Sequence, residues 1–198
     1  EESFSETSFP AAQGRQVYRF KAALWHRASL WRTMEIQGQQ TLAEFDAILR
    51  DAFDHDFSDH LSGFWKRVRR DKSKRFREVD IGDINPLGEG SGSEVHIGGL
   101  GLEPGDELKY VYDFGDWIEH RLTLEAVVEP EAGASYPRVV AQNAPRYQDC
   151  VSCAARGQKV RATWVCLACS ERQGRDVLVC EKCRRAQHGE HYAEEIVY

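Results

Sequence analysis

The first 149 residues contain no cysteine, and no part of the chain is a long apolar run. A membrane-spanning helix needs about 18 consecutive apolar residues, so we expect no span and no membrane partner. The net charge of −6 argues against a protein that coats nucleic acid through its overall field. Such binding depends on clustered Lys and Arg that neutralise phosphates. A nucleic-acid site would therefore have to be local.

Two common nucleotide-binding signatures are also missing. The glycine-rich segment 82–105 has neither the phosphate-loop pattern nor the dinucleotide-binding pattern, and we interpret it as a connector. Asp-Phe-Gly occurs at 113–115, as in kinases, but no glycine-rich phosphate loop with its strand lysine and no His-Arg-Asp loop accompany it. The sequence therefore excludes a kinase.

What is present begins with alternating and helical patterns in the first 140 residues. Thr41 and Glu44 form a capping box ahead of apolar residues at helical spacing, which predicts a helix that ends at the acidic segment 54–60. Alternating segments predict two hairpins, two further strands and a short last strand. These strands are expected at 17–25, 30–36, 64–70, 75–81, 107–114, 117–129 and 136–140.

This order of elements predicts the fold class. One main helix among seven strands leaves too few helices for parallel crossovers, so we expect an α+β domain built on an antiparallel sheet. We expect a disordered leader at 1–16, the α+β domain at 17–145 and a small C-terminal zinc-binding module at 146–198.

The cysteines are confined to this last segment, as three C-x2-C pairs followed by H-x2-H. Disulfide frameworks rarely repeat two-residue gaps, whereas zinc sites do so routinely, and we therefore expect a reducing, cytoplasmic location. Eight ligands make two complete tetrahedral sets, so the sequence predicts two structural Zn²⁺ ions and a module whose folding depends on them. The expected ligands are Cys150, Cys153, Cys166, Cys169, Cys180, Cys183, His188 and His191.

Two ligand pairings are open. In a cross-brace, the first and third cysteine pairs hold one ion, and the second pair and the histidines hold the other. In a sequential arrangement, the first four cysteines hold one ion and the last four ligands hold the other. The ligand order, with both histidines at an expected helix, resembles that of B-box and related treble-clef modules. That resemblance favours the cross-brace.

Several stretches of the first domain resemble one known family. They are "LWRTMEI" at 30–36, "TLAEFDAILRDAF" at 41–53, "HLSGF" at 60–64, "YDFGDWIEH" at 112–120 and "YPRVV" at 136–140. Together they resemble the plasmid pRiA4b ORF-3-like family over residues 17–140, and the resemblance ends after Pro145. It implies a compact α+β domain without a settled biochemical activity. Resolvase and repressor labels circulate for the family, but this chain has neither a serine-recombinase pattern nor a helix-turn-helix.

A basic run at 66–77, with Trp65 and Phe76, predicts a local nucleic-acid site if its cations line one edge of a hairpin. The alternative, which we favour, is a solvated edge hairpin whose charges discourage aggregation. Arg156, Lys159 and Arg161 would extend such a surface. The nucleic-acid candidates in the run are Lys66, Arg67, Arg69, Arg70, Lys74 and Arg75.

The 112–120 turn has a catalytic and a structural interpretation. Carboxylates and imidazoles suit metal-dependent hydrolysis, but Asp-Phe-Gly-Asp between two strands is also typical of a turn, and we favour the structural role. Our main hypothesis is therefore a non-enzymatic adaptor. Its α+β domain would present a groove or sheet edge to a protein partner, and its zinc module would be structural and provide a second protein-binding surface. Nucleic-acid binding is the first alternative and a hydrolase the second, with Asp113, Asp116, Glu119, His120 and His60 as its residues.

Overall fold

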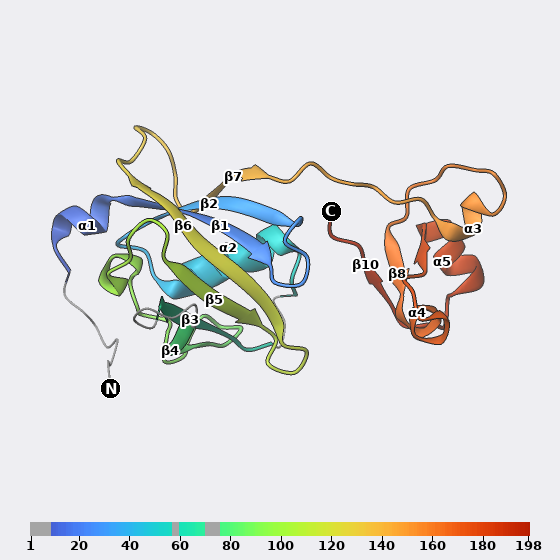
Figure 1. Cartoon of the computed structure of the whole chain (residues 1–198), viewed down its shortest axis with the longest axis horizontal. Coiled ribbons are helices and arrows are strands. Elements are labelled where there is room, and N and C mark those ends of the chain that lie inside the picture. Colours follow the sequence, from blue (N-terminus) through green and yellow to red (C-terminus); the bar gives the residue numbers. More distant parts are fainter. Residues whose placement is uncertain (1–8, 57–59, 70–75) are drawn as a thin grey trace. The chain divides into compact units, whose positions relative to one another are not determined.

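The computed structural model describes residues 9–56, 60–69 and 76–198 (Figure 1). The chain divides between Asn143 and Ala144 into two compact units. We call the unit that ends at Asn143 the sheet domain and the unit Ala144–Tyr198 the cysteine module. The expected boundary lay after residue 145.

The sheet domain is a seven-stranded sheet in the order β4-β3-β5-β6-β1-β2-β7. All its strand pairs are antiparallel, which confirms the predicted α+β class. Helix α2 is the main helix, while α1 and the 3-10 helix η1 are short. The bounds are α1 Ala11–Arg15, β1 Val17–Leu24, β2 Trp31–Gln37, α2 Leu42–Phe53, β3 Ser62–Arg69, β4 Phe76–Ile84, η1 Ile97–Leu100, β5 Glu107–Tyr112, β6 Ile118–Val128 and β7 Arg138–Gln142.

Helix α2 begins and ends as its sequence predicts. The Thr41 hydroxyl accepts a hydrogen bond from the Glu44 backbone N–H, and the Glu44 carboxylate accepts one from the Thr41 N–H. Asp54 ends the helix in the left-handed conformation, with φ 57°. The apolar side of α2 packs on the sheet through Phe45, whose ring contacts the rings of Phe20 on β1 and Phe64 on β3.

Part of the segment 1–16, expected as a disordered leader, is helical. Residues 1–8 lie outside the described part of the chain, but residues 11–15 form α1. The Phe9 ring lies beside Gly14 and Gly98, so closely that a Cβ atom at either position would lie 3.0 to 3.1 Å from the ring. This contact ties the residues before β1 to η1, and no periodicity of the leader itself indicated it.

The cysteine module has its own small sheet, with the strand order β10-β8-β9. Its short helices precede and separate the strands, and its core consists mainly of the six cysteines with Val177 and Val179. The bounds are α3 Val151–Ala154, β8 Trp164–Cys166, α4 Leu167–Gln173, β9 Leu178–Val179, α5 Glu181–Gln187 and β10 Ala193–Glu195.

No helix in the described part of the chain is both long enough and apolar enough to span a membrane.

Candidate metal centres

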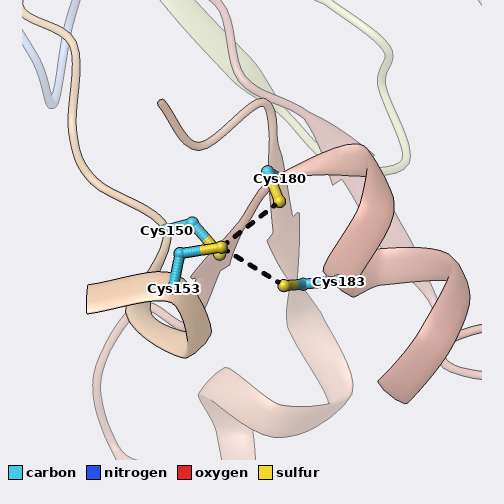
Figure 2. A group of neighbouring side chains, drawn as sticks. All are labelled: Cys150, Cys153, Cys180 and Cys183. Atoms are coloured by element: carbon cyan, nitrogen blue, oxygen red, sulfur yellow. Dashed lines mark hydrogen bonds between the residues drawn. The ribbon is translucent and has the colours of Figure 1, made fainter. Parts of the chain in front are cut away.

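The first group of ligand atoms comes from the first and third cysteine pairs. Cys150 and Cys180 are the N-cap residues of α3 and α5, and Cys153 and Cys183 lie one turn further along these helices (Figure 2). All four sulfur atoms lie within 4.8 Å of one another, and all four residues are buried. The Cys153 sulfur lies 3.8 Å from that of Cys180 and 3.5 Å from that of Cys183.

The second group comes from the second cysteine pair and both histidines. Cys166 ends β8 and is the N-cap of α4, Cys169 lies in α4, and His188 is the C-cap of α5. The Cys169 sulfur lies 3.4 Å from Nδ1 of His188 and 3.3 Å from Nδ1 of His191. Nδ1 of His191 is also 3.5 Å from the Cys166 sulfur.

The chain therefore interleaves the two groups. The first and third pairs meet, and the second pair meets the histidines, which is the cross-brace grouping rather than the sequential one. Antiparallel pairing of β8 with β9 and β10 brings these segments together, because β9 leads directly into Cys180 and β10 follows His191.

The donor sets fit a bound cation. Burial raises the pKa of the Cys153 thiol to about 12. Burial also opposes ionisation of Cys150, but hydrogen bonds from the backbone of Cys180 and Cys153 outweigh it and lower the pKa of that thiol to about 7. Sulfur atoms this close cannot all be thiolates unless a positive charge lies between them, and a coordinated metal ion supplies such a charge. Each group can therefore hold one metal ion.

Of the hydrolase candidates, Asp113 and His60 contact each other, whereas Glu119 and His120 have other partners. Asp113 accepts a hydrogen bond of 2.8 Å from the Gly115 N–H and contacts Nδ1 of His60 at 3.0 Å. Glu119 accepts from the Trp117 indole, while His120 is fully buried with Nε2 3.0 Å from that of His55. Among the described residues, metal-binding groups of three or more His, Cys, Asp or Glu occur in the cysteine module alone.

The basic hairpin forms as β3 and β4. Of the three cations of the run whose side chains are described, Lys66 and Arg67 contact the domain itself and Arg77 is exposed. Lys66 donates to the carbonyl of Leu100 at 2.8 Å. Arg67 pairs with Glu107, and its guanidinium carbon lies 4.3 Å from the ring centroid of Phe76 on β4. Arg70, Lys74, Arg75 and the side chain of Arg69 lie outside the described residues.

With both units described, the chain can be compared with known proteins. Residues 16–155 match the family described as Plasmid pRiA4b ORF-3-like protein. The chain belongs to this family. The match continues beyond Pro145 and includes Cys150 and Cys153, so the expectation that the resemblance ends at Pro145 is corrected. The family thus extends over the sheet domain and into the first metal group.

A solved structure shares the fold. The protein of unknown function MM3350 from Methanosarcina mazei Go1 superposes with a TM-score of 0.50 at 20% sequence identity. The likeness covers 64% of this chain and 68% of MM3350. No curated protein matches the chain.

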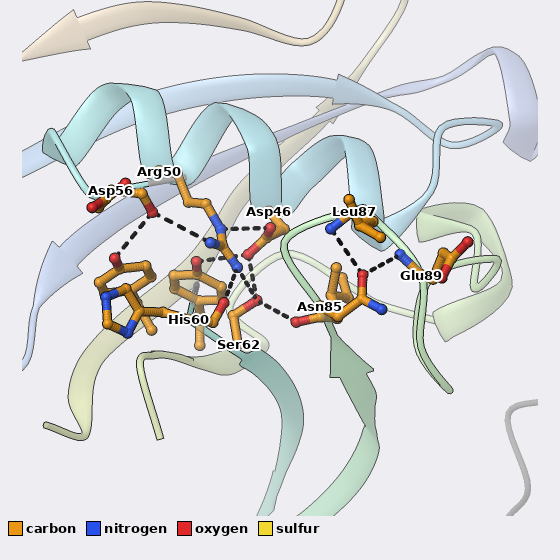
Figure 3. Close-up of polar contacts among 11 residues, drawn as sticks. Asp46, Arg50, Asp56, His60, Ser62, Asn85, Leu87 and Glu89 are labelled. Carbon is orange, nitrogen blue, oxygen red and sulfur yellow. Dashed lines mark hydrogen bonds and ion pairs between the residues drawn. The ribbon is translucent and has the colours of Figure 1, made fainter. Parts of the chain in front are cut away.

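One feature of this pRiA4b ORF-3-like domain escaped the sequence analysis, namely a buried polar network between α2 and the sheet (Figure 3). Asp46 accepts hydrogen bonds from Arg50 Nε at 2.8 Å, Ser62 at 2.5 Å and the Tyr110 hydroxyl at 2.7 Å. Arg50 is 1% exposed and also donates to the carbonyl of His60 at 2.9 Å. The sequence did contain one sign of this network, since Asp46 and Arg50 are charged residues four positions apart on the apolar side of α2.

The same interface contains a pair of neighbouring imidazoles, of which His120 is buried and His55 is partly buried. His55 stacks on Tyr112 with ring centroids 4.2 Å apart, and His120 packs edge-on against Phe53. Burial, and then the charge of Arg50, lower the pKa of His55 to about 4. Burial, and then His55, lower the pKa of His120 to about 3. Both rings are therefore neutral at physiological pH.

Proposed function

We propose that each of the two groups in the cysteine module binds one Zn²⁺ ion. Four sulfur atoms bound to zinc at about 2.3 Å lie about 3.8 Å apart along the edges of a tetrahedron. The distances of 3.8 and 3.5 Å from the Cys153 sulfur agree with this geometry. In a mixed site, sulfur and nitrogen atoms would lie about 3.5 Å apart, close to the 3.3 to 3.5 Å of the second group.

These ions have a structural role in this proposal. A catalytic zinc keeps an open position for water or substrate, whereas four protein ligands complete a tetrahedron. The six cysteines are free thiols and form most of the module's core, so the metal replaces the apolar contacts that a small module lacks. Free thiols also accord with a reducing, cytoplasmic compartment.

We further propose that the protein is a non-enzymatic adaptor that binds a protein partner. The observation that carries this proposal is the face of the seven-stranded sheet opposite α2, which we call the open face. Tyr110 points toward α2, so its neighbour Lys109 and the register partners of Lys109 point to the open face. Four of the five tryptophans lie on this face, namely Trp25, Trp31, Trp65 and Trp117.

The open face is better suited to a protein than to nucleic acid. The cations of the open face lie over its aromatic rings or pair with carboxylates. Lys109, for example, has its Nζ 4.8 Å from the ring centroid of Trp65 and forms an ion pair with Glu78. Phosphate binding requires cations that are available. Tryptophan is enriched in protein interfaces because it combines a large apolar area with a polar N–H, and Trp117 is 46% exposed.

Two measurements test these proposals on the full chain. Elemental analysis of the purified protein should give two zinc ions per chain. Affinity capture from a nuclease-treated host extract should recover a protein partner with the unchanged chain, and W117A together with W65A should abolish the capture. L87A is the matched control, because Leu87 is 83% exposed and lies outside the open face. If the W65A/W117A double variant captured the partner as well as L87A does, a partner site on the open face would be contradicted. If nuclease treatment abolished capture by the unchanged chain, nucleic acid would be the favoured partner.

A further inference from the structure

Two arginines of the cysteine module contact the sulfur atoms of the candidate metal centres. Nη2 of Arg156 lies 3.4 Å from the Cys153 sulfur and 3.5 Å from the Cys183 sulfur. Nη2 of Arg172 lies 3.3 Å from the Cys169 sulfur. Each metal group therefore has one guanidinium that donates N–H groups to its cysteines.

The same local pattern places both arginines. The first two cysteine pairs read C-x2-C-x2-R, as "CVSCAAR" at 150–156 and "CLACSER" at 166–172. A residue three positions along a helical turn lies on the same side, so the guanidinium folds back over the second cysteine. The Arg172 Nε donates to the Ala168 carbonyl at 3.1 Å, which fixes the direction of the side chain.

The third pair provides an internal comparison. Its corresponding position is Ala186, in "CEKCRRA" at 180–186. The arginines next to this pair, Arg184 and Arg185, bind the carboxylate of Glu181 instead. Arg156 compensates for the missing third arginine, because it contacts one sulfur from the first pair and one from the third.

The two centres would differ in net charge. A divalent ion with four thiolates carries a charge of −2, whereas the same ion with two thiolates and two neutral imidazoles carries none. Hydrogen bonds from a cation to a thiolate stabilise its charged form, and outer contacts of this kind tune metal affinity. Arg156 faces the more negative centre and contacts two of its sulfurs.

We infer that Arg156 and Arg172 are the counter-cations of the two centres and set how tightly each ion is held, with Arg156 acting on the all-cysteine centre and Arg172 on the mixed one. They act through the cysteines and do not bind the metal themselves. This inference rests on the proposed zinc sites. It gives a role to two arginines that are not metal ligands. Of these, the sequence indicated only Arg156, as part of a possible basic surface.

The test compares R156Q and R172Q in the full chain, loaded with zinc and titrated with a competing chelator. Loss of one such outer contact typically weakens metal binding by about 10- to 100-fold, and we expect this for one of the two ions in each variant. Cobalt loading identifies the affected centre, since all-sulfur and mixed sulfur–nitrogen sites absorb differently. R156Q should release cobalt first from the all-sulfur site and R172Q from the mixed site.

R185Q is the matched control, because Arg185 is 76% exposed on its side chain and binds Glu181 rather than sulfur. R156K, which keeps the charge without the planar fork, should lie between R156Q and the unchanged chain, and it gives the readout if R156Q does not load. Affinities of R156Q and R172Q equal to that of R185Q would overturn the inference while leaving two zinc ions per chain. A zinc-free unchanged chain would instead overturn the proposed sites themselves.

Discussion

The sulfur atoms of Cys153 and Cys183 lie 3.5 Å apart, although 30 positions separate the two residues along the chain. Cys166 and Cys169, which lie between them in sequence, belong to the other group. Two ions bound in this way would each close a loop that contains ligands of the other. The two sites would then stabilise each other, because each holds in place segments that flank the ligands of the other.

Removal of metal should therefore unfold the cysteine module. Zinc binding contributes about 10–16 kcal/mol in small zinc modules, which exceeds what a core of this size supplies. After treatment with a strong chelator, limited proteolysis with mass spectrometry should show new cleavages between residues 144 and 198. Readdition of zinc should suppress them. Unchanged resistance of this segment after metal removal would contradict a metal-dependent fold.

Substitution of Cys180 distinguishes the two pairings in solution. In the interleaved grouping, C180S removes the all-cysteine site and leaves a mixed site. In a sequential pairing, the same change would leave an all-sulfur site. Cobalt absorption of the variant should therefore be that of sulfur–nitrogen coordination. K182A is the control. Lys182 is exposed and lies between Cys180 and Cys183, so this variant should retain both sites.

The buried network in the sheet domain predicts a large loss of stability in D46A. Removal of this carboxylate leaves Arg50 buried without its ion pair and the Ser62 and Tyr110 hydroxyls without their acceptor. Breaking a buried pair in this way costs about 3–5 kcal/mol. D51A removes an exposed carboxylate from the same helix and should change the stability by less than about 0.5 kcal/mol. Urea denaturation of both variants measures the difference.

The imidazoles of His55 and His120 predict a loss of stability in acid. Their pKa values of about 4 for His55 and about 3 for His120 lie below the 6.5 of an unfolded histidine. The unfolded state therefore binds more protons as the pH falls from 6.5 towards 4. The stability that neutral imidazoles contribute is fully present above pH 6.5 and declines below it, by about 1.4 kcal/mol per pH unit for each ring.

The measurement for this prediction is the free energy of unfolding of the sheet domain between pH 7.5 and 5. H120Q should lower the slope of the free energy of unfolding against pH by up to about 1.4 kcal/mol per pH unit. A loss of stability that is the same at every pH does not affect this slope. H26Q, which changes an exposed histidine, is the matched control. The same slope in H120Q and the unchanged chain would show that His120 does not titrate on unfolding.

Much of the sheet domain follows from local patterns. The capping box at Thr41 and Glu44 sets the start of α2, and alternation predicts each strand to within a few residues. The last strand is displaced, from the predicted 136–140 to Arg138–Gln142, because its limits depend on pairing with β2 rather than on its own sequence. The register of strands far apart in the sequence is likewise a property of their partners.

The sequence by itself determined α2 and the strands of the sheet domain, the fold class and the eight candidate ligands, because helical periodicity, strand alternation and two-residue cysteine gaps are local features. The tertiary structure decided which ligands share a centre, why Asp46 and Arg50 can be buried, and that four tryptophans share one face. Each of these depends on contacts between residues distant in sequence. Local spacing cannot specify such contacts, since the same spacing is compatible with several arrangements of strands and loops.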